Sequence, residues 1–390
     1  MNFKKIILIF NTPALNTDIQ TYSLWELIDL GYNVTVLDAS PFLMPEANRI
    51  VTTERLSDVR FESHICNTKR NLENFVKQNA ATACFIPMFN SYYDVRFVFK
   101  LFTKYKVFYG HVTTARTELE LSSFGIKYKK TWKNSRFNPV HLYKAFYNRI
   151  GRKLLHIEKA KFVVLGGKAN SQQYINATEH DENTKILCLH TWDYERFLSK
   201  EKYDNNGKPY CVFLDQYFPF HPDLKTEIGF DFAEDDKKKF VSDMNKVFSH
   251  IRNNYNLEII IAAHPRANYK DKNDLYPNVK IEYGKTAELI KGASLAVANF
   301  SNSIMLAVMA KIPLIIVNSS VIQKCNYTET VLLEFAKITG AFVATDYSVL
   351  PKSFEISICK EKYKNIEDDY LKSGESNGKK IWQLIMEAIK

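Results

Sequence analysis

No apolar stretch in the 390-residue sequence approaches the ~20 residues that a membrane-spanning helix needs. The first apolar run, residues 6–10, is too short for a signal peptide and ends in a polar Asn-Thr-Pro, so it predicts a first β-strand. The cysteines form no C-x-x-C pair, have no histidine at metal-ligand spacing, and several lie in apolar runs. Such cysteines are typical of reduced core thiols, and the sequence predicts a cytoplasmic protein.

The loops that mark common nucleotide-binding enzymes are also missing. There is no G-x-G-x-x-G and no G-x-x-x-x-G-K-[ST] loop, so neither dinucleotide oxidoreduction nor P-loop phosphoryl transfer is supported. There is no Asp-x-Asp pair and no His/Asp cluster with metal-ligand spacing. We therefore expect no metal and no cofactor, with basic side chains and a helix N-terminus neutralising a leaving phosphate in place of Mg²⁺.

Strand-like and helix-like segments alternate in both halves of the chain. This rhythm predicts parallel sheets with helices on both faces. A charged stretch at 201–209, with Gly207 and Pro209 and little apolar content, separates the halves. We predict an acceptor-binding domain over 1–200, a nucleotide-sugar-binding domain over 201–365, and a C-terminal helix over 366–390 that crosses back to the first domain. Two such domains imply one cleft, lined by residues that follow strands.

The apolar strand predicted over 257–263 ends in His264-Pro265-Arg266. Because Pro265 restricts the backbone of the residue before it to extended geometry, we expect the His264 ring to project from the sheet edge. A protonated imidazole there can bind a phosphate or donate a proton to a leaving oxygen, and Arg266 adds a second positive group. A second His-Pro, at His221, lies deeper in a loop.

Four polar residues separate a predicted strand at 295–298 from a helix of small and apolar residues: Asn299, Ser301, Asn302 and Ser303. Free N–H groups at the start of a helix favour an anion, and hydroxyls add further donors. One serine would suffice to cap the helix, so the remaining polar groups favour an anion site over a cap alone.

Other strand ends supply further candidates. Asp215 ends the strand predicted over 210–214, and its carboxylate could deprotonate an acceptor hydroxyl. A Gly turn carries Tyr283, Thr286 and Glu288, which could hold the base and ribose of a nucleotide. Candidates for the acceptor side rest on position alone, and they are Asn11, Thr12, His111, Thr113, Arg116 and Gln216.

The formal net charge of +10 is concentrated over 127–161, where Glu158 is the single acidic residue and aromatic residues are interleaved with basic ones. The pattern fits a solvated helical face, a surface that docks on anionic lipids or an acidic glycan, or a nucleic-acid surface. We expect peripheral contact with an anionic membrane on its cytoplasmic side, and no nucleic-acid partner.

A strand ending in His-Pro, followed by a strand–Ser-x-Ser–helix unit, resembles the bacterial sialyltransferases and polysialyltransferases of GT-B fold. It also resembles capsule transferases that use CMP-activated Kdo or other nonulosonic acids. The resemblance covers roughly 210–317. It implies two Rossmann-like parallel-sheet domains facing across a cleft, with His264, Ser301 and Ser303 at the donor phosphate. The acidic-acidic-Gly motif of the sialyltransferases is absent, and Asp215 is the nearest acidic residue.

The resemblance implies a metal-independent glycosyltransferase that moves a sialic, pseudaminic or Kdo-type sugar from a CMP-sugar to a capsule or lipopolysaccharide glycan. Three alternatives remain open. A CDP-glycerol or CDP-ribitol phosphotransferase of the teichoic-acid type also has two domains and a His-Pro. A GT-B transferase that uses a UDP-sugar is the second. The third is a non-catalytic assembly protein that binds an anionic glycan through 127–161.

Overall fold

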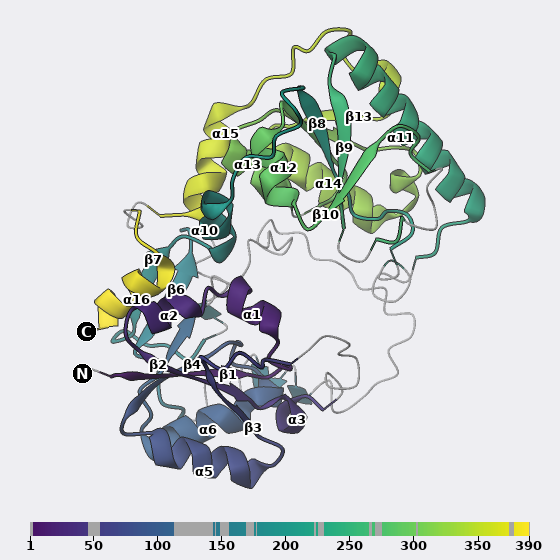
Figure 1. Ribbon diagram of the computed structural model, residues 1–390. Helices are drawn as coiled ribbons and strands as arrows, with labels where there is room; N and C mark the ends of the chain where they lie inside the picture. The colour runs from purple at the N-terminus through teal and green to yellow at the C-terminus, as the bar shows by residue number, and fades with distance from the viewer. Residues whose placement is uncertain are drawn as a thin grey trace. The chain divides into compact units, whose positions relative to one another are not determined.

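The computed structural model describes residues 3–45, 55–112, 143–144, 146–148, 156–168, 175–176, 178–221, 224, 230–264, 267–269, 275–301, 303–373 and 378–389. The chain divides into two compact units. Unit 1 comprises Met1–Thr117, Lys129–Glu195 and Asp368–Lys390, and unit 2 comprises Glu118–Tyr128 and Arg196–Glu367. Each unit is built on a parallel sheet (Figure 1).

The sheet of unit 1 has two parts that are joined at β4 and β5. One part has the order β3-β2-β1-β4, with β1 at Lys5–Phe10, β2 at Asn33–Asp38, β3 at Glu62–Ile65 and β4 at Ala83–Pro87. The other has the order β5-β6-β7, with β5 at Gly110–Val112, β6 at Phe162–Gly166 and β7 at Lys185–Leu189. The Phe85 amide donates to the Phe108 carbonyl at 3.0 Å and a parallel bridge pairs Phe85 with Tyr109, which links the two parts.

Both faces of this sheet are buried. Along β1, Ile6 and Leu8 belong to one apolar cluster and Ile7 and Ile9 to another, because successive side chains of a strand point to opposite faces. The first cluster is covered by α1 (Asn16–Thr21), α2 (Trp25–Asp29) and α16 (Ile381–Ile389). The second is covered by α3 (Ser40–Leu43), α5 (Lys69–Asn79) and α6 (Arg96–Tyr105). Figure 1 shows the two helix groups on opposite sides of the strands.

The C-terminal helix α16 belongs to the core of unit 1. Trp382 is fully buried, its ring centroid lies 5.5 Å from that of Trp192, and its indole N–H donates to the Tyr22 carbonyl at 2.6 Å. The segment before it runs through α15 (Lys360–Ile366) and the π-helical turn η8 (Glu367–Leu371). The chain therefore starts and ends its folded structure in the same unit.

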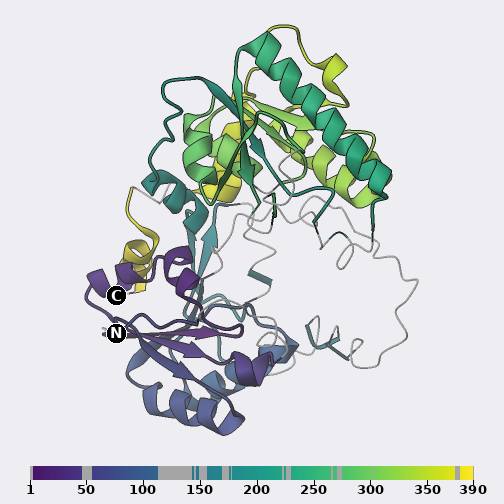
Figure 2. The same cartoon turned by 45° about the vertical axis from the view of Figure 1, so that its right-hand side comes forward.

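Unit 2 has a six-stranded parallel sheet of order β10-β9-β8-β11-β12-β13 (Figure 2). The strands are β8 at Tyr210–Leu214, β9 at Glu258–Ala263, β10 at Lys280–Tyr283, β11 at Leu295–Ala298, β12 at Leu314–Val317 and β13 at Phe342–Ala344. The connecting helices are α11 (Glu234–Tyr255), α12 (Thr286–Gly292), α13 (Ile304–Ala310) and α14 (Asn326–Thr339). The connections through α11 and α13 step across the sheet in opposite directions, so right-handed crossovers place these helices on opposite faces.

The strand order creates a switch point in unit 2. The chain leaves β8 for β9 and β10 on one side, and then returns to pair β11 with the other side of β8. The loops after β8 and β11 therefore diverge from neighbouring strands at the same edge of the sheet. Ligands of open α/β sheets bind at this kind of position.

Two elements have other bounds than the sequence predicts. The spacing of apolar residues over 18–30 predicts one helix, but the chain forms α1 and α2, which are divided around Ser23, whose φ of 48° is left-handed. The residues 106–110 predict a strand, but Lys106 ends α6 in a left-handed conformation and β5 begins at Gly110. Among the helices of the described residues, none combines the length and the apolar character needed to cross a bilayer.

Candidate active site

The candidate residues of unit 2 gather at the carboxyl edge of its sheet. Asp215, His264 and Asn299 are the first residues after β8, β9 and β11, and these three strands are neighbours in the order β9-β8-β11. Since all pairings are parallel, the three residues lie at one edge. The parallel arrangement predicted from the sequence is thus what brings them together.

Asp215 lies at the centre of a hydrogen-bond network. Its Oδ1 accepts from the Tyr217 amide at 2.7 Å, and its Oδ2 accepts from the Tyr269 hydroxyl at 2.9 Å and the His264 amide at 3.3 Å. Asp215 is only 5% exposed, and burial raises its pKa from 3.8 to about 6 despite these three donors. Its oxygens are occupied and covered, which corrects the expectation that this carboxylate deprotonates an acceptor. Asp215 instead positions the backbone of His264 and of the loop after β8.

His264 is half-buried and lies beside a second histidine. Its ring centroid is 4.8 Å from that of His221, and the two planes are nearly perpendicular at 80°. His264 comes from the end of β9 and His221 from the loop after β8. The sequence contained a signal for this pair, because both histidines precede a proline on loops that follow successive strands. Pro265 and Arg266 lie outside the described residues.

Ser301 and Gln216 join the two sides of the switch point. The Gln216 side-chain amide donates to the Ser301 hydroxyl at 2.7 Å, and the Ser303 amide donates to the same hydroxyl at 3.2 Å. Ser301 is fully buried. It therefore shapes the turn before α13 rather than presenting its hydroxyl at a surface. Gln216, expected on the acceptor side, is bonded within the unit that holds the predicted donor residues.

Asn299 and Ser303 flank this turn. Asn299 is fully buried and donates from Nδ2 to the Val317 carbonyl at 2.9 Å, while its Oδ1 has no hydrogen-bond partner among the residues the structure describes. Ser303 is half-buried and immediately precedes α13, which has seven residues. A helix this short contributes little dipole, so the hydroxyl of Ser303 matters more to an anion than the sequence argument assumed. Asn302 is outside the described part of the chain.

The residues predicted around the Gly turn after β10 lie in different environments. Tyr283 is exposed, and its hydroxyl accepts from the Tyr269 amide at 3.3 Å, so it adjoins the hydrogen-bond network around Asp215. Thr286 is the first residue of α12. The Glu288 carboxylate forms an ion pair with Lys200 at 3.2 Å, so its charge is already engaged by a lysine.

Asn11, Thr12 and His111, the unit 1 candidates that the structure describes, do not form one cluster. Asn11 follows β1 and donates from Nδ2 to the Tyr92 hydroxyl, and Thr12 beside it is exposed. His111 is 1% exposed and stacks on Phe99 at 5.5 Å, so it is a core residue and not part of an acceptor surface as expected. Thr113 and Arg116 lie outside the described residues.

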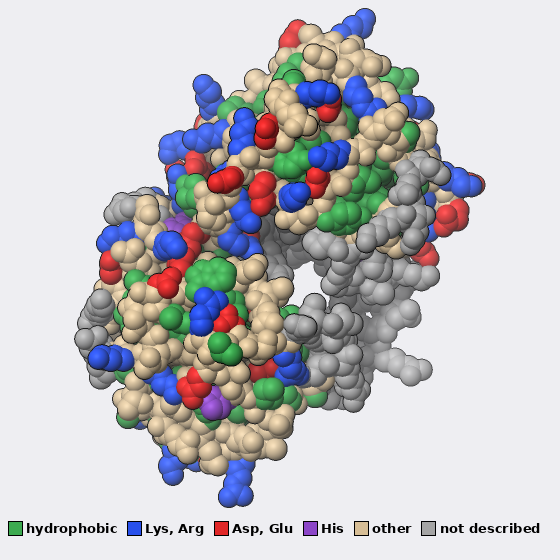
Figure 3. All heavy atoms as spheres, viewed as in Figure 1, with side chains coloured by type: hydrophobic (Ala, Val, Ile, Leu, Met, Phe, Trp, Pro, Cys, Tyr) green, Lys and Arg blue, Asp and Glu red, His purple; other side chains and the backbone are tan. Residues whose placement is uncertain are grey.

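Most of the basic 127–161 segment also lies outside the described residues. Within it, Lys144 pairs with Asp94 at 2.7 Å, Lys159 with Glu179 at 3.2 Å and Lys161 with Glu158 at 3.0 Å. These three lysines are therefore neutralised locally. On the face of unit 2 drawn in Figure 3, basic and acidic side chains are interspersed.

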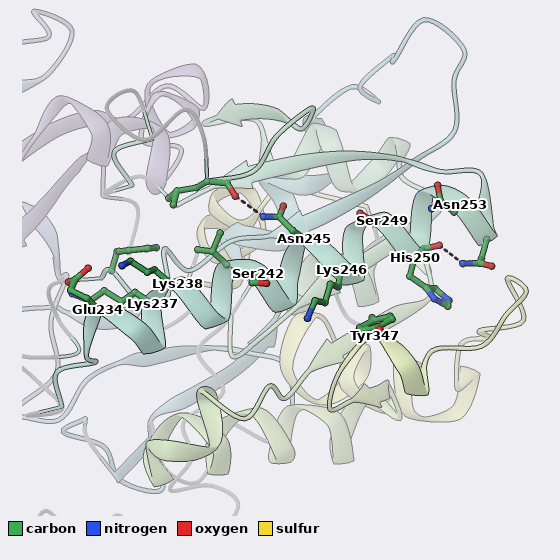
Figure 4. A pocket seen from close by; sticks show the side chains of 14 residues that line it. Glu234, Lys237, Lys238, Ser242, Asn245, Lys246, Ser249, His250, Asn253 and Tyr347 are labelled. Carbon is green, nitrogen blue, oxygen red and sulfur yellow. Dashed lines mark hydrogen bonds and ion pairs between the residues drawn. The ribbon is translucent and has the colours of Figure 1, made fainter.

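A separate hollow of about 1080 Å³ lies along α11 in unit 2 (Figure 4). Lys246 and Tyr347 line it, and Asn245 donates to the Leu275 carbonyl at 2.8 Å at its side. None of the residues proposed from the sequence lines this hollow. Over the described ranges, no three His, Cys, Asp or Glu side chains are grouped as a metal site would require.

Comparison with solved structures places the chain in a fold class. It superimposes on the wall teichoic acid polymerase TagF with a TM-score of 0.56 and 13% identity, over 99% of this chain and 88% of that one. A TagF variant with one histidine changed to asparagine, in a structure soaked with CDPG, matches with a TM-score of 0.51, 13% identity and the same coverage. The predicted fold class, GT-B with two Rossmann-like domains, is thereby confirmed.

The chain is less similar in structure to the UDP-GlcNAc 2-epimerase of Methanocaldococcus jannaschii, with a TM-score of 0.49 and 13% identity over 99% of both chains. At that score it bears on neither fold nor function. No family model matches the sequence, and no curated protein matches it either.

Proposed function

We propose that this chain is a metal-independent glycosyltransferase that takes a nonulosonic acid from a CMP-sugar and adds it to a bacterial surface polysaccharide, with sialic, pseudaminic and Kdo-type sugars as the candidate donors. The observation that carries the proposal is the position of His264. It leaves β9 at the carboxyl edge of unit 2, with its amide held by Asp215 and its ring against His221. Ser303 follows the neighbouring loop after β11.

In the proposed reaction, the bond between the anomeric carbon and the CMP phosphate oxygen breaks, and an acceptor hydroxyl oxygen forms the new bond to that carbon while its proton passes to water. Charge develops on the departing phosphate. A protonated His264 donates a hydrogen bond or a proton to it, and the Ser303 hydroxyl and Arg266 add donors. Asp215 and Ser301 act through these groups, by fixing the loops that carry them.

Nucleotide binding provides the first test. The melting temperature is measured with CMP, CDP, UMP, UDP, GDP and CTP, each in EDTA. A ligand at about 100 times its Kd that binds only folded protein adds about 2.7 kcal/mol. We expect CMP to stabilise most. A larger shift with UDP or GDP would indicate that the donor carries that nucleotide instead of CMP. No shift with any nucleotide would favour the glycan-binding assembly protein.

His264→Ala tests the catalytic role. Loss of a group that assists the leaving phosphate should lower turnover by roughly 100-fold or more. His250→Ala is the matched control, because His250 lies on α11 and its Nε2 is bonded to the Pro351 carbonyl. Near-normal turnover in His264→Ala would remove His264 from the mechanism.

A second candidate is supported by the TagF likeness. A CDP-glycerol or CDP-ribitol phosphotransferase would use the same edge of unit 2 to hold a CDP donor, and one matching TagF structure was soaked with CDPG. Product analysis separates the two candidates. A glycosyltransferase of the first kind leaves a glycosidic bond, whereas a phosphotransferase leaves a phosphodiester and releases CMP from a CDP donor.

We further propose that the protein works on the cytoplasmic side of the membrane and touches anionic lipid through 127–161. Co-sedimentation with vesicles containing phosphatidylglycerol should occur at low salt and weaken as salt is raised. Binding that persists at high salt, or fails at low salt, would contradict this contact.

A further inference from the structure

A small hollow of about 370 Å³ opens at the carboxyl edge of the unit 1 sheet. It is formed by the end of α3 and the first turns of α5 and α6, which follow β2, β3 and β4 respectively. It is lined by Phe42, Leu43, Lys69, Asp94, Arg96, Phe97 and Lys100. Its size is near the lower end of the ~300–1,000 Å³ that small-molecule sites span, and carboxyl edges are where ligands of such sheets bind.

Three cationic side chains face this hollow without a carboxylate of their own. Lys69 comes from α5, and Arg96 and Lys100 lie one turn apart on α6. Within the described part of the chain, none of the three lies within ion-pair distance of an acidic group. The one carboxylate in the lining, Asp94, is already paired with Lys144 at 2.7 Å. Glu73, one turn along α5, interacts with Lys69 through its charge but does not line the hollow, so three cations and one paired carboxylate face this space.

The positions of these cations do not serve helix stability. Lys69 and Arg96 are the first residues of their helices, where the exposed N–H groups already carry partial positive charge. A cation there is unfavourable by up to ~1 kcal/mol, whereas an anion is favourable. Neither position favours the helix itself, and a bound anion would offset the cost at both.

The side chains are also held in place. The Arg96 guanidinium lies 3.6 Å from the centroid of the Tyr93 ring and donates to the Tyr93 carbonyl at 2.7 Å. The Lys69 ammonium lies 4.7 Å from the Phe97 ring centroid. Ordered cations lose less conformational freedom on binding than mobile ones do. Phe42 and Phe97, whose ring centroids lie 5.7 Å apart, form an apolar wall beside the charge.

From this arrangement we propose that the hollow binds the carboxylate or phosphate group of an anionic acceptor glycan. The assignment rests on the proposed function, and it names the acceptor class: an acidic polymer, held in unit 1, to which the sugar is added. Arg96 offers a planar pair of donors to such a group, and Lys69 and Lys100 supply point charges.

Binding of defined probes tests the assignment. Trigalacturonate supplies carboxylates, glycerol 3-phosphate supplies a phosphate, and maltotriose is the neutral control. Each is titrated by calorimetry at 50 and 300 mM NaCl against the full-length wild type, Arg96→Gln, and the double variant Arg96→Gln/Lys100→Gln. Lys77→Gln is the matched control, because it removes one exposed positive charge from the last turn of α5, away from the hollow.

We expect at least one anionic probe to bind the wild type and weaken at 300 mM NaCl, while maltotriose does not bind. The double variant should lose roughly tenfold or more in affinity, as expected for losing a charge-assisted hydrogen bond. Lys77→Gln should bind as the wild type does. Whichever anionic probe binds more tightly identifies carboxylate or phosphate as the recognised group.

Equal binding of maltotriose, wild-type affinity in the double variant, an equal loss in Lys77→Gln, or no binding of either anion would each overturn the proposal. The CMP-induced melting shift, measured on the same variants, separates this proposal from the proposed function. A preserved shift with failed probe binding rejects the acceptor hollow alone. Probe binding that depends on Arg96, with no nucleotide shifting the melting temperature, rejects the glycosyltransferase assignment instead.

Discussion

Replacing Asp215 by asparagine tests whether this carboxylate is a buried positioning group. Burial raises its pKa from 3.8 to about 6, so the folded protein favours the protonated form. The stability that this group contributes is present below its unfolded pKa and is lost as pH rises through about 6. The full loss corresponds to about 3 kcal/mol, from roughly two pKa units at ~1.4 kcal/mol each.

The measurable quantity is the difference in unfolding free energy between wild type and Asp215→Asn. Asparagine is uncharged throughout, and the cost of facing its NH₂ group toward the Tyr217, His264 and Tyr269 donors does not vary with pH. Integrating the two pKa values between pH 5 and pH 7.5, we expect the difference to fall by about 1.4 kcal/mol. Urea denaturation, followed on the transition of unit 2, gives both values.

Two control measurements accompany this experiment. Glu258→Gln removes an exposed carboxylate whose pKa is lowered by Lys208, and which is ionised across this range in both states, so its difference should stay flat. Repeating Asp215→Asn in a His264→Ala background removes coupling to that imidazole. A difference that is constant or rises with pH would show that Asp215 ionises without a burial cost, and the positioning argument would fail.

Three further predictions concern the stability of the two units and the CMP-induced shift. Trp382→Ala should destabilise unit 1 by about 3–5 kcal/mol, measured by denaturation, with Trp382→Phe costing less. Gly167→Ala should lower the free energy of unfolding clearly more than Gly31→Ala. Both glycines have left-handed φ, but a Cβ on Gly167 would overlap the Asp369 backbone, whereas one on Gly31 meets nothing within 4 Å. Equal melting temperatures of the two variants would refute the contact at Gly167. Ser301→Ala should lower the stability of unit 2 by ~1–2 kcal/mol and reduce the CMP-induced shift, and an unchanged shift would show that its bond to Gln216 does not shape the site.

The strands that sequence reasoning located best are those buried on both faces. The predicted ranges 210–214 and 295–298 match β8 and β11 because parallel strands covered on both sides are continuous apolar runs. The edge strand β3, Glu62–Ile65, was missed, and all four of its residues are exposed. Without an apolar run or an alternation, such a strand has no local signal.

Side-chain burial at the site was less predictable than position. Asp215 and His264 both follow apolar strands, so no local pattern distinguishes a covered side chain from an accessible one at these positions. The difference arises from the Tyr217 amide and the Tyr269 hydroxyl, which donate to the carboxylate from the loops after β8 and β9. His111 was misplaced for a similar reason, since Phe99 on α6 covers a ring that the strand pattern alone leaves open.

The contact between Gln216 and Ser301 could not be predicted from the sequence. The two residues are 85 positions apart, and they meet because β11 pairs with β8 instead of extending the sheet beyond β10. The rhythm of strands and helices predicts a parallel sheet but not this order, since either side of the sheet would satisfy the same pattern. The strand order decides which loops share an edge. It brings Gln216 to the turn that carries Ser301 and Ser303, the residues predicted to bind the donor.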